Sequence, residues 1–153
     1  MLFLLFHLGN DRYALDVGQV AEVLPLVRLK RIAQAPPAVA GVCDFHGKPV
    51  PVVDLNQMAL GLPARSRLST RIVLVHFQVG PGERRLLGLM AERVTQTIRR
   101  QSADFVATGV DVDAARYLGP VTRDAGGLIQ RIEVDQLLTP AVRDLLFHPQ
   151  DAP

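Results

Sequence analysis

The chain lacks the residues that large aromatic cores and disulfide-bonded folds require. It has no tryptophan, 2 tyrosines, 6 phenylalanines and a single cysteine in 153 residues. One cysteine excludes an intramolecular disulfide bond and fits a reducing cytoplasm. Because Cys43 lies in an apolar run, we predict a small buried core residue and not a nucleophile.

Long apolar runs are also missing. No stretch reaches the roughly 18 apolar residues that a membrane span needs. The apolar start, Met1 to Phe6, has neither the basic leader nor the small-residue cleavage site of a signal peptide. We therefore expect a cytoplasmic protein that does not insert into the membrane.

The chain has no large excess of either charge sign. Its 17 Lys and Arg and 15 Asp and Glu give a net charge of +2. The arginine pairs at positions 65 and 67, 84 and 85, and 99 and 100 are separated, with no aromatic residues between them. Strong nucleic-acid binding needs a continuous basic stripe or a stacking platform, so these pairs predict solvated surface. We expect no nucleic-acid partner, although a small nucleic-acid-binding barrel stays open as the alternative class.

Turn-forming residues are frequent, with 11 prolines and 12 glycines. This pattern predicts a mostly β fold of many short strands and a few short helices, typical of small barrels. Expected strands are 2–8, 12–15, 22–26, 29–32, 71–78, 84–90, 94–98, 117–121 and 128–134. Asp16 is expected to cap a short helical turn. Helices are expected at 55–60 and, with proline in the first turn, at 140–147.

A β-hairpin is predicted within residues 41–55, where two apolar runs flank the turn His46-Gly47-Lys48. Pro49 and Pro51, two residues apart, remove donors from one side of the second strand. That strand therefore starts at a sheet edge or a barrel opening. Asp54 follows it and is suited to cap the next helix.

The polar residues form no pattern that indicates catalysis or metal binding. Histidines 7, 46, 76 and 148 lack metal-ligand spacing, and Asp111 and Asp113 lack the glycine and glutamate of a calcium loop. Asp54 and Glu92 could form a carboxylate pair, but a helix cap and a surface or strand-end acid explain them more simply. We predict no enzyme activity, metal or cofactor. An enzyme subunit completed by a partner chain remains a second alternative.

An ordered series of motifs resembles the CheW family of chemosensory adaptor proteins and the similar regulatory domain of the CheA histidine kinase. The resemblance spans roughly residues 2 to 147. It is carried by segments 6–15, 20–23, 35–36, 41–42, 46–47, 49–55, 70–75, 87–94, 117–119 and 137–138. It implies a single domain over 1–150, made of two SH3-like β-barrels with a carboxy-terminal helix. The expected lobes are 15–65 and 66–135, with the terminal segments completing the second.

The resemblance also implies function. It implies a non-catalytic protein that joins a CheA-type kinase regulatory domain to the cytoplasmic tip of a methyl-accepting chemoreceptor, recruited to membrane-associated receptor arrays. By position in the matching motifs, the receptor-binding groove would include Val20, Glu22, Gly41 and His46. Arg71 and Ile72 would fall near surfaces that contact partners.

The chain departs from the family pattern at several positions. His46 stands where arginine is usual, and histidine is shorter and mostly neutral near pH 7. An acidic partner of that residue, such as Glu22 or a receptor side chain, would therefore be bound differently. Glu92 replaces a common aspartate, and Gln130 and Arg131 interrupt the last long strand. These changes favour an accessory pathway, such as surface sensing or second-messenger control.

Overall fold

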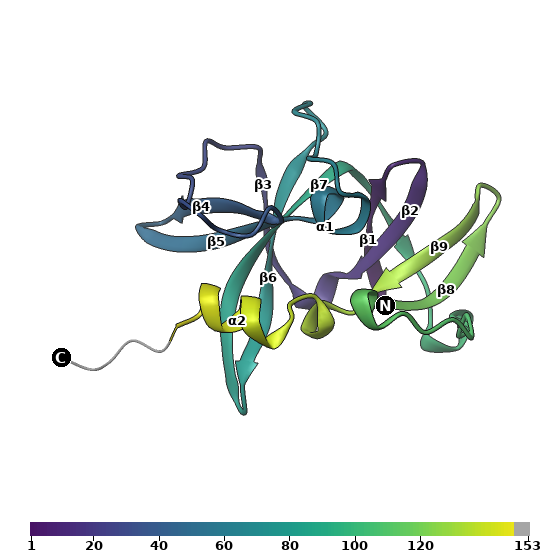
Figure 1. Cartoon of the computed structure of the whole chain (residues 1–153). Helices are drawn as coiled ribbons and strands as arrows, with labels where there is room; N and C mark the ends of the chain where they lie inside the picture. Colours follow the sequence, from purple (N-terminus) through teal and green to yellow (C-terminus); the bar gives the residue numbers. More distant parts are fainter. Residues whose placement is uncertain (149–153) are drawn as a thin grey trace.

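The computed structural model describes residues 1–148, which form two β-sheet lobes joined by one long strand (Figure 1). The strands are β1 (Leu2–Leu8), β2 (Asp11–Asp16), β3 (Val20–Pro25), β4 (Val39–Phe45), β5 (Lys48–Asp54), β6 (Arg71–Gly80), β7 (Glu83–Arg99), β8 (Leu118–Asp124) and β9 (Gly127–Ile132). The α-helices are α1 (Leu55–Leu60) and α2 (Pro140–Leu146), and 3₁₀ helices lie at Val17–Gln19, Ser102–Asp104, Asp113–Ala115 and Val134–Gln136. No helix of these 148 residues is long and apolar enough to cross a membrane.

Strand β7 connects the two lobes. Its first half pairs with β6 and, in parallel, with β5, whereas its second half pairs with β1. The sequence predicted two separate strands, 84–90 and 94–98, and this was wrong. The register of β1 and β7 shifts between Leu5 and His7, and Arg93 has φ of 52°. This bulge lets one strand bend from one sheet into the other.

The lobes do not follow the expected ranges 15–65 and 66–135. One lobe contains β3, β4, β5, β6 and the start of β7, because β6 pairs with both β3 and β7. The other contains β1, β2, β8, β9 and the end of β7, with β2 parallel to β9. Figure 1 shows the first group on the left and the second on the right. Residues 149 and 150 of the expected domain lie outside the described residues.

Most of the other predicted elements are confirmed within a few residues. The exception is the strand expected at 29–32, where only Lys30 forms an isolated bridge, to Val42. The chain crosses over β4 at this point instead of running beside it. Asp16 caps the 3₁₀ turn at 17–19 by accepting from the Gly18 N–H at 2.9 Å, as predicted.

The β4–β5 hairpin is confirmed, and so is the one-sided pairing of β5. His46 and Gly47 form its two-residue turn with φ of 51° and 83°, and Asp44 accepts from the Gly47 N–H at 2.8 Å. Strand β5 pairs with β4 from Lys48 onward but contacts β7 only through Val52–Asp54. The start of β5 therefore has a strand neighbour on one side alone, as its prolines predict.

The largest core cluster lies between the lobes and draws buried residues from both, including Phe6, Leu15, Val73 and Leu89. A second cluster fills the lobe of β3–β6 and contains Cys43, which is 1% exposed. Burial raises the pKa of the Cys43 thiol, so it is protonated and unreactive at neutral pH. The prediction that Cys43 is a core residue is confirmed.

Helix α2 closes the chain against β6. Thr139 caps it by accepting from the Val142 N–H at 3.2 Å, and Pro140 occupies the first turn, as predicted. The Phe147 ring stacks on Phe77 with 5.7 Å between centroids. This stacking places the end of the helix beside the β6–β7 hairpin (Figure 1).

An ion pair between β2 and the β8–β9 turn predicts a pH-dependent stability. Arg12 donates two hydrogen bonds to Asp124, at 2.9 and 2.5 Å, and the Gly126 N–H donates a third. These bonds lower the pKa of Asp124 from 3.8 to about 2. A lowered carboxyl pKa stabilises the fold above the unfolded-state value, and this contribution is lost as pH falls from about 4 through about 2.

We therefore expect Asp124→Asn to lower the urea midpoint at pH 7 and to have a much smaller effect at pH 2, where about half of the carboxyl groups are protonated in the folded state. Urea unfolding of both proteins between pH 2 and pH 7 measures this difference. A difference that stays constant across this range would show that the carboxylate charge plays no part.

Candidate partner-binding site

A groove of about 770 Å³ opens where β5 and β7 stop pairing, and we call it the β5–β7 groove. Its residues come from β3, the β4–β5 hairpin, β6, β7 and the end of α2. They are Ala21, Phe45, Lys48, Pro49, Val50, Pro51, His76, Arg84, Arg85, Leu86 and Phe147.

Local sequence explains why this groove stays open. Pro49 and Pro51 lack the N–H groups with which β5 could continue its ladder to β7. From Glu83 to Leu87, β7 pairs with β6 on one side and, among residues 1–148, has no strand on the other. The groove thus offers an apolar floor beside an unpaired strand edge, which are features of peptide-binding sites.

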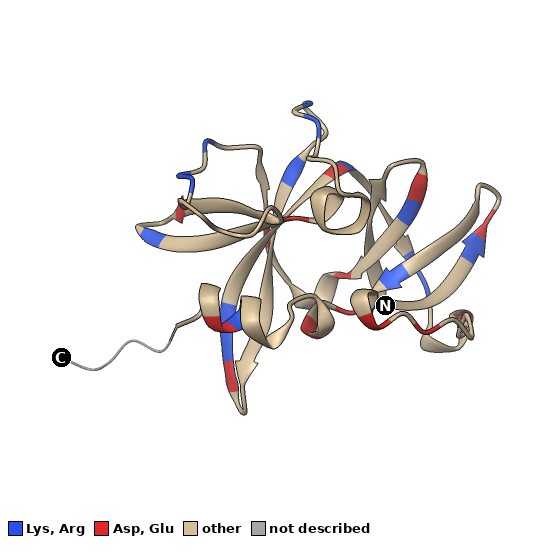
Figure 2. Cartoon of the chain, viewed as in Figure 1, with Lys and Arg blue, Asp and Glu red and all other residues tan. Residues whose placement is uncertain are grey.

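The charged residues that line the groove are all of one sign. Lys48, Arg84 and Arg85 line it, together with His76, and no carboxylate is among the lining residues. The Arg85 guanidinium lies 5.4 Å from the centre of the Phe147 ring. Elsewhere, Lys, Arg, Asp and Glu are scattered over both lobes (Figure 2). The groove therefore suits an apolar segment that carries acidic residues.

The predicted residues Val20 and Glu22 lie on β3, next to this groove. Val20 is half-buried and packs against the core cluster shared by the two lobes. Glu22 is exposed, and Ala21 between them lines the groove. Since β3 pairs only with β6, its other edge has no strand neighbour in the part of the chain that the structure describes.

His46 is exposed at the tip of the hairpin that forms one wall of the groove. Its ring packs edge-on against Phe45, with 4.3 Å between centroids, and Phe45 lines the groove. No ion pair joins His46 to Glu22 within residues 1–148. The structure thus brings both segments to one groove through their neighbours, and their own side chains do not meet.

Gly41 is buried under the crossing segment at residues 29–30. A Cβ atom there would lie 2.4 Å from the Lys30 carbonyl oxygen and 3.2 Å from the Leu29 Cβ. Its φ of 144° is a conformation that side chains rarely adopt. This glycine is therefore required by the fold, and it offers no surface to a partner.

Ile72 does not fit the role of a partner contact, because it is fully buried in the core of its lobe. Residues 72–75 of β6 are all 0% exposed, because both faces of the strand are covered there, and the place of Ile72 near a partner surface stays a prediction. Arg71 is half-buried at the start of β6, and its Nε has no hydrogen-bond partner within residues 1–148. This nitrogen is itself buried, so it is not exposed to a partner.

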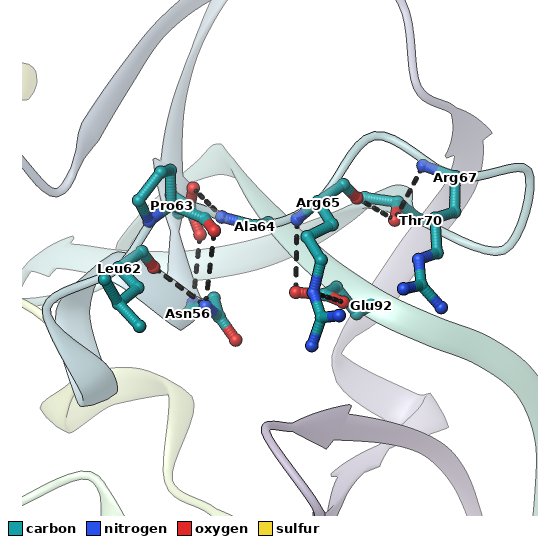
Figure 3. A network of polar contacts seen from close by, with 9 residues as sticks. Asn56, Leu62, Pro63, Ala64, Arg65, Arg67, Thr70 and Glu92 are labelled. Carbon is teal, nitrogen blue, oxygen red and sulfur yellow. Dashed lines mark hydrogen bonds and ion pairs between the residues drawn. The ribbon is translucent and has the colours of Figure 1, made fainter.

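The carboxylates of Asp54 and Glu92 both hold the link between α1 and β6, and Figure 3 shows the contacts of Glu92. Asp54 accepts from the N–H groups of Asn56, Gln57 and Ala64, at 2.9, 3.1 and 2.8 Å. Glu92 accepts from the Arg65 N–H at 3.1 Å and pairs with its guanidinium at 3.7 Å. The predicted cap is confirmed.

Glu92, however, is not a surface or strand-end acid. It is 8% exposed and lies in the middle of β7. The Thr70 hydroxyl adds a bond to the Arg65 carbonyl oxygen at 2.5 Å (Figure 3). Glu92 thus holds the α1–β6 link against the strand that connects the lobes.

The unusual residues of β9 are accommodated by local contacts. The Arg131 guanidinium lies 5.3 Å from the centre of the Phe3 ring and pairs with Asp16 and Glu133, both at 3.8 Å. The Gln130 side chain donates to the Gly119 carbonyl oxygen at 3.0 Å. Both departures from the family pattern therefore serve the packing of this lobe.

Comparison with known proteins identifies the family. The CheW-like domain matches residues 2–141, almost all of the described chain. The chain belongs to the CheW-like domain family. The chemotaxis protein CheW of Klebsiella aerogenes is 27% identical over 143 residues, which cover 90% of this chain and 81% of that protein. The same-named protein of Helicobacter pylori is 25% identical over 104 residues, which cover 67% of this chain and 59% of that protein.

A solved structure also shares the CheW-like fold. The scaffolding protein TtCheW from Thermoanaerobacter tengcongensis has a TM-score of 0.77 and 23% identity, and the match covers 89% of this chain and 86% of that one. The predicted pair of SH3-like β-barrels is thereby confirmed. Within residues 1–148, no three His, Cys, Asp or Glu side chains are grouped so that they could hold a metal ion.

Sequence reasoning missed several residues of the groove in this CheW-like domain. Arg84 and Arg85 were predicted to be solvated surface, and both are exposed, but their position on the groove beside Leu86 and Phe147 was not predicted. The paired prolines of β5 were the available signal, since they predicted an opening. What would face that opening depends on the fold of distant segments.

Proposed function

We propose that this protein is a non-catalytic adaptor between a chemoreceptor and a CheA-type histidine kinase. The observation that carries the proposal is the CheW-like domain match over residues 2–141. The adaptor would bind the kinase regulatory domain and the cytoplasmic tip of a methyl-accepting chemoreceptor. It would work in the cytoplasm, recruited to membrane-associated receptor arrays.

The two partners are assigned to different surfaces. We assign the kinase regulatory domain to the β5–β7 groove, because this groove lies within one lobe and has an apolar floor with a basic rim. We assign the receptor tip to the surface around Val20 and Glu22, because Val20 packs at the junction of the lobes. His46 borders the groove and is a proposed contact, as is Arg71. Gly41 and Ile72 would affect binding only through the fold.

The pathway we propose is an accessory one, such as surface sensing or second-messenger control. Its support is the exposed His46 at the hairpin tip, where the family usually has arginine. A partner carboxylate that forks to arginine would meet a shorter, single-donor group here. The cognate partner is therefore expected to differ at the facing position.

Charge reversal at the groove rim tests the assignment of surfaces. We expect Lys48→Glu with Arg84→Glu to weaken binding of the kinase regulatory domain from the same genome by about tenfold or more, because two cations facing acidic groups are reversed. Wild-type affinity should be on the order of micromolar, as is common for signalling contacts. Isothermal titration calorimetry measures both affinities.

The matched control is Arg67→Glu with Arg123→Glu, which changes the net charge equally at exposed positions outside the groove. This control should bind the kinase domain as the wild type does. Binding of a receptor-tip fragment should change little in either variant. Equal weakening by both double variants would reveal a general charge effect and refute the groove assignment.

A further inference from the structure

We propose that a small inorganic oxyanion, of the sulfate or phosphate class, binds in a second cavity at the bulge of β7. This cavity has a volume of about 170 Å³ and shares no residue with the β5–β7 groove. It is lined by Leu5, His7, Arg12, Ser69, Arg93, Thr95 and Gln96. We call it the bulge cavity.

The backbone around the bulge cavity is held in an unusual conformation. Leu5 pairs with Gln96 and His7 pairs with Glu92, so one residue of β1 faces three residues of β7. Among these three, Arg93 has φ of 52°, a left-handed conformation that is uncommon for a long side chain. The Val94 N–H donates to the Ser69 carbonyl oxygen at 3.0 Å, which ties the bulge to the α1–β6 link. Such bulges redirect side chains, and here Arg93 lines the cavity.

The charges at the bulge cavity leave one arginine without a partner. The carboxylate of Glu92 is engaged by Arg65, and Arg12 already binds Asp124. For Arg93, no side-chain hydrogen bond or ion pair occurs with any other described residue. None of the lining residues carries a negative charge. An oxyanion in this cavity would be attracted by both arginines and opposed by Glu92 and Asp124, whose carboxylates are already paired with Arg65 and Arg12.

A buried polar atom also points to a missing acceptor. The Nδ1 atom of His7 is buried and has no hydrogen-bond partner within residues 1–148. Buried polar groups in folded proteins are nearly always hydrogen-bonded. Because Nδ1 is closed to solvent, it can donate to an oxyanion only when the ring turns toward the cavity, whereas Ser69 and Thr95 line the cavity with hydroxyl groups that can donate. The cavity thus combines charge and several donors, which is the chemistry of an oxyanion site.

The titration of His7 follows from the same surroundings. Its pKa is lowered by burial first and then by Arg93 and Arg12, with Glu92 acting in the opposite direction. A bound dianion would counter both arginines, so it should raise this pKa. By linkage, sulfate should bind more tightly as pH falls through the pKa of His7, while the charge of sulfate itself does not change.

Nuclear magnetic resonance of the histidine ring protons tests the proposal on the full chain. We expect a saturable shift of the His7 signal when sodium sulfate is added at constant ionic strength, and a higher His7 pKa when sulfate is saturating. Arg93→Gln should weaken sulfate binding by about tenfold, the effect of losing one charge-assisted hydrogen bond. Arg93→Lys should retain binding, and the control Arg67→Gln should bind as the wild type does. Circular dichroism establishes that each variant is folded.

Several outcomes would overturn the inference. A His7 shift that sodium chloride reproduces at equal ionic strength would reflect screening alone, and unchanged sulfate binding by Arg93→Gln would remove the central ligand. Inorganic phosphate should bind as sulfate does. Tighter binding of O-phospho-L-serine than of inorganic phosphate would refute a free inorganic oxyanion and indicate a phosphate ester.

Discussion

Gly41→Asp is expected to destabilise the protein by about 3 kcal/mol, the sum typical of a strained backbone and an overpacked site. The new Cβ would lie 2.4 Å from the Lys30 carbonyl oxygen, at a φ of 144°. To relieve this contact, the crossing segment must move, which breaks its two backbone hydrogen bonds with Val42, at 2.8 and 2.9 Å. Urea unfolding followed by circular dichroism measures the loss.

Gly47→Ala is the matched control for this glycine. Gly47 also has a positive φ, of 83°, but a Cβ there would meet no atom within 4 Å. Only the backbone strain remains, so we expect a cost of about 1 kcal/mol. If Gly41→Asp kept the wild-type unfolding midpoint and lost receptor binding alone, Gly41 would be a contact residue and our structural role for it would be wrong.

Asp54→Ala is expected to cost about 3 kcal/mol, because three backbone N–H groups lose their acceptor at a buried position. Two of these groups begin α1, and the third fixes the α1–β6 link at Ala64. Asp54→Asn keeps one acceptor oxygen and should lose about half as much. Thermal and urea unfolding of both variants measure these differences.

Asp111→Ala provides the comparison for Asp54→Ala. Asp111 is exposed, so its removal should change stability by no more than about 0.5 kcal/mol. The α1–β6 link should also exchange its amide hydrogens faster in Asp54→Ala than in the wild type. Equal stability of Asp54→Ala and Asp111→Ala would contradict the role that we give to the buried carboxylate.

Local features of the fold could be predicted from the sequence. The β4–β5 hairpin, the one-sided pairing of β5 and the Asp54 cap depend on residues within a few positions of one another. Proline, glycine and aspartate act on their own backbone, so their effects appear wherever they occur. The two barrels were expected from the family resemblance, and the structural comparison confirms them.

The features that were missed depend on distant segments. The polar residues Glu92 and Arg93 seemed to end a strand, yet Arg65 and Ser69 from the α1–β6 link hold the bulge within one continuous β7. The β5–β7 groove is formed by β3, the β4–β5 hairpin, β6, β7 and the end of α2. Phe147 reaches it only because α2 packs on β6. No pattern within a single segment reports such a convergence.

The structure was also needed to judge the residue roles that the family resemblance implied. Position in a motif cannot distinguish an exposed contact from a buried support, and it grouped exposed Glu22 and His46 with buried Gly41. Ile72 shows the same difficulty, because its neighbour Arg71 is half-buried while Ile72 is wholly inside. Arg71 lies at the start of β6, whereas both faces of the strand are buried from Ile72 to Val75.

The most direct measurement of the adaptor function is co-sedimentation of the kinase with receptor-containing vesicles. The kinase and the receptor should come from the same genome as this chain. We predict that the kinase regulatory domain sediments with the vesicles only when this protein is present, and that Lys48→Glu with Arg84→Glu abolishes this recruitment while the protein itself still sediments. Recruitment of the kinase domain that is independent of this protein, or absent in its presence, would contradict the proposed function.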